Sequence, residues 1–239
     1  MDESEHATAT ATWLDLYDYR RRVAEMYRRR AEALRVGQDE ADTQARFRAA
    51  KDALFAHHPQ SALGPDDRAH FTGLRYFAYN PALRQEATLA PETDPADQEM
   101  EASGPHTMRF HRAGRVRFTI EGTPLELIVY WIDVYGGGLF LPFRDATCPA
   151  ESYGGGRYLF DTVKGSDFIP LDAAGAPAPP AAGAATPMGY TGGRILLDFN
   201  YAYNPSCAYD PRWVCPLAPN ENRLAVAIRA GERKYHEDE

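Results

Sequence analysis

The spacing of the hydrophobic residues changes near residue 74, and this change constrains the fold more than any other feature. Before it, apolar side chains recur every three or four residues, which is typical of amphipathic helices. Residues 11–35 and about 43–57 predict two helices, and Pro65 starts a short third helix that ends near Gly73. We therefore expect a disordered tail at 1–10, an N-terminal helical section at 11–73 and a β domain at 74–235.

The β domain shows short runs in which apolar and polar residues alternate, as in strands with one buried face. Residues 107–121 predict a hairpin whose turn lies at Ala113-Gly114, and 125–134, apolar on both faces, predicts a central strand. The acidic stretch 90–104 and the Ala/Pro/Gly-rich insertion 173–189 predict loops. The predicted fold is mainly β (α+β overall): an antiparallel β-barrel or β-sandwich with the N-terminal helices packed on it. Further strands are expected at 75–79, 84–89, 139–143, 157–163, 194–200 and 224–229.

The charge and hydropathy of the chain argue against several classes of partner. A net charge of -8 is unlike a nucleic-acid-binding surface, which is usually basic. No run approaches the roughly 18 apolar residues of a membrane helix, and the N-terminus lacks the apolar region of a secretory signal. We expect a cytoplasmic protein without nucleic-acid or membrane partners. Its N-terminal helices pack across the sheet or pair two copies in a homodimer.

Several segments in the second half of the chain resemble one known family. They read FRDATCPAESYGGGRYLFD at 143–161, LDFNYAYNPSCAYDPRWVCPLAPNENRL at 197–224 and AIRAGERKY at 227–235. Together with weaker likeness at 71–89 and 118–130, they resemble the domain-of-unknown-function family DUF1684 from about residue 45 to the end. The family usually has Thr where this chain has Ser152, a small residue and Gly at Cys148-Pro149, and a shorter connection at the insertion. The resemblance implies where a site lies and implies no activity.

The ionisable and amide groups of these segments form the predicted site. Arg144 and Arg157 present planar forks that grip a carboxylate or phosphate, so they are the candidate anchors for a small anionic ligand. Salt bridges that only fix the loops are the alternative for both. The candidate proton-transfer groups are Asp145, Glu151, Asp198 and Glu221. The other candidate ligand-binding residues are Tyr153, Gly154, Gly155, Gly156, Asn200, Tyr203, Asn204 and Asn222.

Cys207 and Cys215 bracket a proline-rich, aromatic loop, and three interpretations stay open for them. They are packed thiols, a disulfide that closes the loop, or zinc ligands. Zinc would need two further ligands, and the chain has no CxxC or HxxxH pair. We therefore expect no metal and no organic cofactor.

Three functional hypotheses follow. The first is a cofactor-independent enzyme of the hydrolase, isomerase or lyase type that acts on a small polar or anionic molecule. The second is a small-molecule-binding β-barrel without catalysis, and the third is a polar network that only stabilises the fold. Predicted site residues that meet at an open cleft favour the first two, whereas groups sealed among themselves favour the third.

Overall fold

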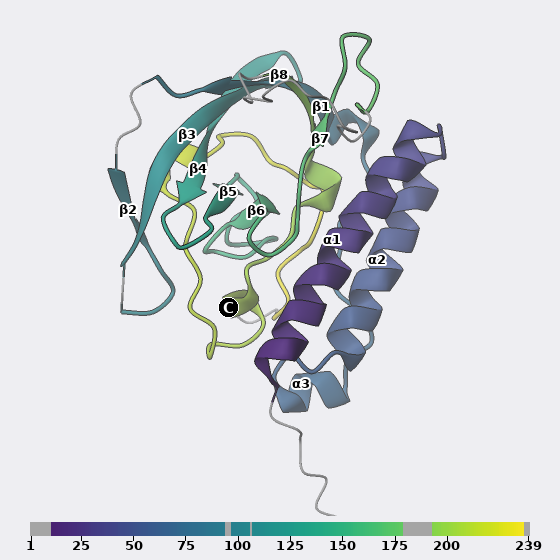
Figure 1. The fold of residues 1–239 in the computed structure, drawn as a ribbon, viewed down its shortest axis with the longest axis vertical. Helices are drawn as coiled ribbons and strands as arrows, with labels where there is room; N and C mark the ends of the chain where they lie inside the picture. The colour runs from purple at the N-terminus through teal and green to yellow at the C-terminus, as the bar shows by residue number, and fades with distance from the viewer. Residues whose placement is uncertain (1–10, 94–96, 106, 179–192, 237–239) are drawn as a thin grey trace, which may run out of the picture.

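The computed structural model describes residues 11–93, 97–105, 107–178 and 193–236 (Figure 1). The predicted tail at 1–10 lies outside these residues. The helical section forms α1 (Trp13–Arg35), α2 (Glu40–His57) and α3 (Pro65–Ala69). A capping box starts α1, because the Thr12 hydroxyl accepts from the Asp15 N–H and the Asp15 carboxylate accepts from the Thr12 N–H. Asp39 caps α2 in the same place of its helix, so α2 begins three residues before the predicted start at 43.

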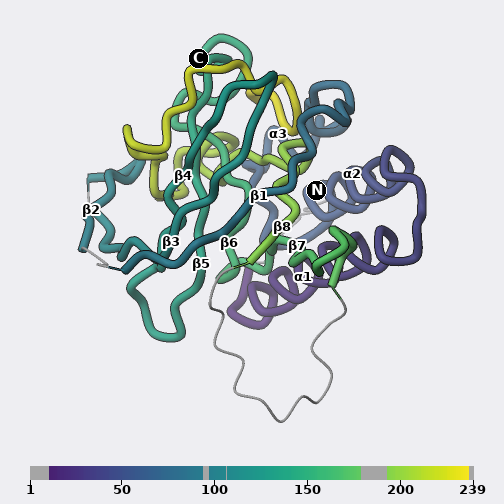
Figure 2. Tube along the Cα trace, turned by 90° about the horizontal axis from the view of Figure 1, so that it is seen from above, coloured from purple at the N-terminus to yellow at the C-terminus, as the bar shows by residue number. Residues whose placement is uncertain are grey.

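One antiparallel sheet forms the rest of the framework, in the order β6-β5-β4-β3-β1-β8-β7, with β2 paired to β3. It curls into a half-barrel, so the predicted mainly β, α+β fold class is confirmed as a single curled sheet (Figures 1 and 2). The strands are β1 (Arg84–Pro91), β2 (Asp97–Glu101), β3 (Thr107–Ile120), β4 (Thr123–Ile132), β5 (Gly138–Phe143), β6 (Arg157–Asp161), β7 (Ile169–Pro170) and β8 (Gly193–Asp198).

The hairpin predicted at 107–121 is wrong, because β3 runs through Ala113-Gly114 as one strand with a bulge. The turn into β4 lies instead at Glu121 and Gly122, which have φ of 50° and 78°. A Cβ at Gly114 would lie 2.6 Å from the Ala90 carbonyl oxygen, so this glycine permits the close approach of β1. A glycine inside an alternating run marked a bulge here and not a turn.

Other segments also differ from the prediction. Residues 75–79 and 224–229 lie outside the named strands, and Tyr76 makes one isolated bridge with Glu232. The acidic stretch 90–104 contains the edge strand β2. The first part of the insertion, 173–178, forms a tight turn in which the Asp172 carboxylate accepts from two backbone N–H groups. Residues 179–189 of the insertion lie outside the described part of the chain.

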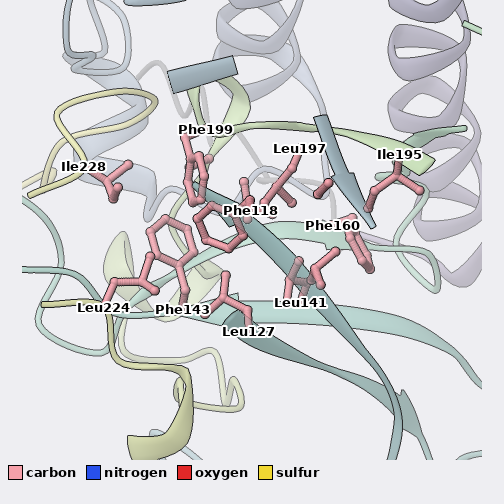
Figure 3. Packing of buried hydrophobic residues seen from close by; sticks show 14 of the residues in the cluster. Phe118, Leu127, Leu141, Phe143, Phe160, Ile195, Leu197, Phe199, Leu224 and Ile228 are labelled. Atoms are coloured by element: carbon pink, nitrogen blue, oxygen red, sulfur yellow. The ribbon is translucent and has the colours of Figure 1, made fainter. Parts of the chain in front are cut away.

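The main hydrophobic core fills the hollow of the curled sheet (Figure 3). Phe118, Phe143 and Phe199 bring their rings together there, and Leu224 and Ile228 of the C-terminal segment cover them. β4 also contributes Ile128 and Tyr130 to a second cluster on its other face, as expected of a strand that is apolar on both sides. The main cluster therefore holds the C-terminal segment against the sheet.

The helices α1 and α2 lie side by side at the β7–β8 end of the sheet (Figures 1 and 2). Ala31 and Leu34 of α1 pack on Ile169, Leu171 and Leu196 of this edge. The helices therefore cover the sheet as predicted, and pairing of two copies through them stays a prediction. Within the described residues, no helix is long and apolar enough to span a membrane.

Candidate functional site

Arg157 and Asp145 form an ion pair that is sealed from solvent. Both side chains are 0% exposed, and the Arg157 Nη2 lies 3.0 Å from Asp145 Oδ1. The other carboxylate oxygen accepts from the backbone N–H of Ile228 at 2.7 Å and from the N–H and hydroxyl of Thr147. Four protein donors therefore hold this carboxylate, one on Oδ1 and three on the other oxygen.

The same arginine ties down the C-terminal segment. Its two terminal nitrogens donate to the backbone carbonyls of Ile228, Ala230 and Glu232, at 2.5 to 3.0 Å. The guanidinium carbon lies 5.2 Å from the centre of the Phe143 ring. These contacts use the fork to fasten 228–232 onto β6, so the pair stabilises the fold and presents nothing to a ligand.

The glycine run 154–156 is packed against the chain. Gly156 has a φ of 93°, and a Cβ there would lie 2.7 Å from both the Phe143 carbonyl oxygen and the Ala218 side chain. A Cβ at Gly155 would meet the Tyr153 ring at 2.5 Å, and one at Gly154 would meet Pro149 at 3.3 Å. The neighbours of the glycines are protein atoms, which matches a close passage of backbone.

Asp198 and Asn200 join the helical section to the sheet. Asp198 pairs with Arg30 of α1 at 3.0 Å, and both side chains are 4% exposed. Its other oxygen accepts from the backbone and side-chain N–H groups of Asn200. Asn200 exchanges hydrogen bonds with the backbone of Asn80, and its carbonyl accepts from Gln44 of α2. Two separate helices are therefore fastened to the end of β8.

Asn222 and Glu221 lie on the other side of the sheet. Asn222 is fully buried and bonds the N–H and carbonyl of Ile128 and the carbonyl of Pro142, so it bridges β4 and β5. Glu221 accepts from the Tyr130 hydroxyl and the Arg112 guanidinium, and its side chain is 27% exposed. Burial, together with the hydrogen bond to Glu221, raises the pKa of Tyr130.

Glu151 and Arg144 are two further candidates from the sequence. Glu151 pairs with Arg229 at 2.7 Å, and this hydrogen bond lowers the pKa of Glu151. The backbone of Arg144 pairs with Asn222 and Leu224, while its Nε has no hydrogen-bond partner among the described residues. Within the described part of the chain, no hydrogen bond links Asp145 or Arg157 to Asp198 or Glu221, so the predicted site residues form separate networks.

A cavity lies elsewhere, between the helices and the sheet. Its volume is 70 Å³, and we name it the interface cavity. Among the predicted site residues, Tyr203 and Asn204 line it. Burial raises the pKa of Tyr203 and Tyr27, so both hydroxyls are protonated at neutral pH. The interface cavity is lined by Tyr19, Val23, Met26, Tyr27, Phe47, Lys51, Leu54, Phe55, Tyr158, Lys164, Ser166, Tyr203, Asn204, Pro205, Ser206 and Tyr209.

Another ion pair, between the partly buried Lys51 and the buried Glu232, lies at the wall of this cavity. Glu232 is 1% exposed and accepts from Lys51 of α2, the Tyr209 hydroxyl and the Asn204 N–H. The Lys51 ammonium also lies 4.7 Å from the centre of the Tyr203 ring. No pattern in the sequence points to this pair, although Glu232 lies inside the AIRAGERKY segment. The separation of 181 residues left no local pattern to join its members.

Asn204 has an unused polar atom at the same place. Its side-chain N–H donates to the Arg233 carbonyl, but its Oδ1 has no hydrogen-bond partner among the described residues. The residue is 4% exposed, so bulk water does not readily supply a partner. The interface cavity therefore combines an aromatic wall, a buried ammonium and an open amide acceptor.

The chain is similar to one family and to a solved structure. The family described as "Protein of unknown function (DUF1684)" matches residues 69–233, which is more than half of the chain. The chain belongs to the DUF1684 family. The resemblance noted in the sequence is thus confirmed, over a shorter span than residue 45 to the end.

An uncharacterised protein from Haloarcula marismortui, solved by NMR in solution, has a similar fold to this DUF1684 member. It is 33% identical, with a TM-score of 0.53, and the match covers 81% of this chain and 93% of that chain. No curated protein matches the sequence. Neither the family description nor the name given to the solved structure states an activity.

The DUF1684 match includes one side of the interface cavity. Tyr158, Ser166 and the segment 203–209 lie within residues 69–233, as does Glu232. Lys51 and the other helical lining residues precede the match. The part of the chain that the structure describes contains no cluster of three or more His, Cys, Asp or Glu side chains that could hold a metal ion.

Proposed function

We propose that this protein binds a small molecule in the interface cavity. The observation that carries the proposal is the cavity itself, whose 70 Å³ far exceeds the roughly 10–15 Å³ that one water molecule needs. Ligand sites are typically concave and mostly apolar, with a few polar groups that orient the ligand. Phe47, Leu54 and Phe55 supply the apolar wall, while Tyr203 and Asn204 supply polar groups.

The charges around the cavity favour an anionic end on the ligand. Lys51 and Lys164 line it, and no carboxylate is among the lining residues. Glu232 already accepts from Lys51, but an ammonium has three donors, so further hydrogen bonds are available. Lys164 is 43% exposed and lies 3.9 Å from Asp161, an ion pair that solvent weakens. We therefore propose a compact ligand with an aromatic or aliphatic body and a carboxylate.

The side-chain oxygen of Asn204 sets a second requirement for the ligand. Asn204 Oδ1 lacks a partner among the described residues, and a buried acceptor without one costs about 1–3 kcal/mol. A ligand that also carries an N–H or O–H group offsets this cost. Small hydroxy- and amino-substituted carboxylic acids meet both requirements.

The test is a thermal-shift series with small aromatic and aliphatic carboxylic acids and their neutral amides. Val23→Phe fills the cavity from α1, and Val36→Phe makes the same change at an exposed position. We expect the acids to stabilise the wild type and Val36→Phe, and to stabilise Val23→Phe at least tenfold less in apparent affinity. Equal shifts in the three proteins, or no shift with any acid, would contradict the proposal.

A charge-matched pair of variants tests the anionic end. Lys164→Gln should weaken the binding of the acids and leave that of the amides unchanged. Arg21→Gln is the control, because Arg21 is on α1 with a side chain that is 69% exposed and it is not a lining residue of the interface cavity. An equal effect of both substitutions would show that only the overall charge matters.

A cofactor-independent enzyme is a second proposal, and it would depend on Glu221. Among the four predicted carboxylates, Asp145 and Asp198 are held by protein donors on both oxygens and Glu151 is paired at the surface with Arg229. Glu221 also has both oxygens bonded, by Tyr130 and Arg112, but its side chain is 27% exposed, so a substrate can reach it as a general base. Turnover of any acid that binds, lost in Glu221→Gln and retained in Glu151→Gln, would support this role.

A further inference from the structure

Arg144 and Arg223 lie side by side on two neighbouring segments of the chain. A parallel bridge pairs them, because the Arg144 N–H donates to the Asn222 carbonyl at 2.9 Å and the Leu224 N–H donates to the Arg144 carbonyl at 2.7 Å. The backbones of bridged residues lie about 4.8 Å apart, and their side chains point to the same side. The two arginines therefore extend from adjacent positions on one face.

The burial of the flanking residues shows that this face is the outer one. Arg144 is partly exposed and Arg223 is exposed. The four residues that flank them along the chain are at most 3% exposed: Phe143, Asp145, Asn222 and Leu224. Successive residues of paired segments point to opposite faces, so the flanking side chains enter the core and both arginines point away from it.

Neither arginine has a partner for its guanidinium within the described part of the chain, where no hydrogen bond, ion pair or ring contact involves either side chain. The carboxylates closest to them in the sequence are already paired, Asp145 with Arg157 and Glu221 with Arg112. By contrast, all four arginines of β3 pair with a carboxylate. In a chain with a net charge of -8, two adjacent arginines without a counter-charge form an exceptional basic spot.

The guanidinium of Arg144 opens outward from a stem that packs on the protein. A Cβ at Gly156 would lie 3.1 Å from Arg144 Cγ, so this glycine leaves the space in which the stem lies. The Nε of Arg144 is sealed from solvent without a hydrogen-bond partner among the described residues, whereas its two terminal nitrogens are not sealed. The packed stem lowers the conformational entropy that Arg144 would lose when its terminal nitrogens bind a ligand.

Small side chains follow the arginine pair on the same face. The Ala146 N–H donates to the Val226 carbonyl at 3.0 Å, so the two segments stay paired beyond the arginines. Ala146, Ala225 and Ala227 are exposed and follow Arg144 and Arg223 at steps of two residues. The body of a small ligand can lie over these alanines while its charged end reaches both guanidiniums.

We propose that Arg144 and Arg223 bind the phosphate group of a small phosphate monoester. Such a group carries about two negative charges at neutral pH and three acceptor oxygens, so it can compensate two guanidiniums at once. A carboxylate carries one charge and leaves one arginine uncompensated. Neither arginine lines the interface cavity, so the site is separate from it and does not depend on the function proposed there.

The test is calorimetric titration of the full-length protein with methyl phosphate and with acetate, at low ionic strength. The buffer contains a reductant, because all three cysteines are free thiols in the structure, namely Cys148, Cys207 and Cys215. We expect saturable one-to-one binding of methyl phosphate and much weaker binding of acetate. Arg144→Gln and Arg223→Gln should each weaken the binding of methyl phosphate by about tenfold, as expected for the loss of a charge-assisted contact. Arg144→Lys keeps the charge without the planar fork, so its loss should be smaller.

Two variants serve as controls. Arg229→Gln removes an arginine of the same segment that is 62% exposed and paired with Glu151, and Val23→Phe fills the interface cavity. Both should bind methyl phosphate as the wild type does. No saturable binding, equal affinity for acetate, or equal losses in the controls would overturn the proposal.

Sedimentation with vesicles that contain phosphatidic acid is the second arm, because this lipid carries the same monoester group. Binding of the wild type to methyl phosphate in solution supports a small-molecule ligand. Binding to the vesicles without binding to methyl phosphate would contradict it.

Discussion

Two of the ion pairs that join distant parts of the chain differ in what surrounds them. Arg157–Asp145 lies in the C-terminal core with both side chains 0% exposed, and backbone groups of 228–232 complete its hydrogen bonds. Lys51–Glu232 lies between α2 and the C-terminal segment, and its lysine lines a cavity. The sequence made the first pair the leading candidate for a ligand site and left the second one unnoticed.

Residue type alone therefore does not decide whether a buried charged group can still bind a ligand. An arginine with four donated hydrogen bonds has little left to offer, and it costs too much to expose. A lysine with one carboxylate partner at a cavity wall keeps donors for another molecule. We therefore expect substitutions at the first pair to change stability, and substitutions at the second pair to change stability and binding together.

The largest effect should come from Arg157→Ala. It leaves Asp145 buried without a counter-charge, and removal of one member of such a pair costs about 3–5 kcal/mol in the free energy of unfolding. Urea unfolding measures this loss, and Arg229→Ala is the control. Arg229 is 62% exposed and pairs with Glu151 at the surface, so its loss should cost less than about 1 kcal/mol.

Ligand binding to Arg157→Ala tests whether the Arg157–Asp145 pair is closed to ligands. If the acids that bind the wild type stabilise Arg157→Ala by the same increment, the sealed pair has only a structural role. A selective loss of ligand binding in Arg157→Ala, at temperatures where the variant is folded, would instead return Arg157 to the ligand site.

Lys51→Met should have a smaller effect on stability and a larger one on binding. Glu232 keeps the Tyr209 hydroxyl and the Asn204 N–H as donors, and Lys51 is 14% exposed, so we expect a cost of about 2–3 kcal/mol. Binding of carboxylic acids should fall at least tenfold. Calorimetry on the folded variant checks this, and unchanged affinity would show that the ammonium does not contact the ligand.

The sequence predicted the framework because the framework has a local cause. Apolar residues repeat with the helical period in α1 and α2, and they alternate in most strands, so burial of one face already determines these elements. β2 was missed because its acidic residues form an edge strand with little apolar content. The turn predicted at Gly114 was wrong because the sequence alone does not show whether a glycine reverses the chain or allows a neighbouring strand to approach closely.

The site was less predictable because its geometry is not local. The motifs singled out Asp145, Arg157 and Asn222, which are all buried, but a motif does not tell whether a polar group is sealed or open to a ligand. That depends on the carbonyls of 228–232 and on Ile128, which lie far away in the sequence. Lys51 is outside every motif, so its meeting with Glu232 needed the fold.

Tyr209→Phe removes a single hydrogen-bond donor from Glu232 of the Lys51–Glu232 pair. The hydroxyl is buried and bonds only the Glu232 carboxylate among the described residues, and a hydrogen bond to a charged group is worth about 1.5–3 kcal/mol. We expect a loss near the lower end of this range, because Lys51 and the Asn204 N–H still compensate Glu232. Chemical unfolding at neutral pH measures it. A cost as large as that of Arg157→Ala would mean that the two pairs are equally closed.

The smallest effect concerns another buried carboxylate, Asp161, which has no arginine ion-pair partner among the described residues. Burial raises its pKa from the ordinary value of 3.8. Lys164, whose ammonium lies 3.9 Å away, opposes this shift only in part. The folded state therefore holds the proton more tightly than the unfolded state. The stability from this protonated group is complete below the unfolded pKa and is lost as pH rises through the folded one.

Asp161→Asn removes this titration and keeps the shape of the side chain. We expect the wild type to lose stability relative to Asp161→Asn as pH rises above the ordinary aspartate pKa of 3.8, measured by urea unfolding at each pH. Asp145→Asn should behave in the opposite way and be less stable than the wild type at neutral pH, because Asp145 is compensated by Arg157 and three further donors. If Asp161→Asn tracked the wild type at every pH, burial alone would not distinguish a weakly compensated carboxylate from a sealed one.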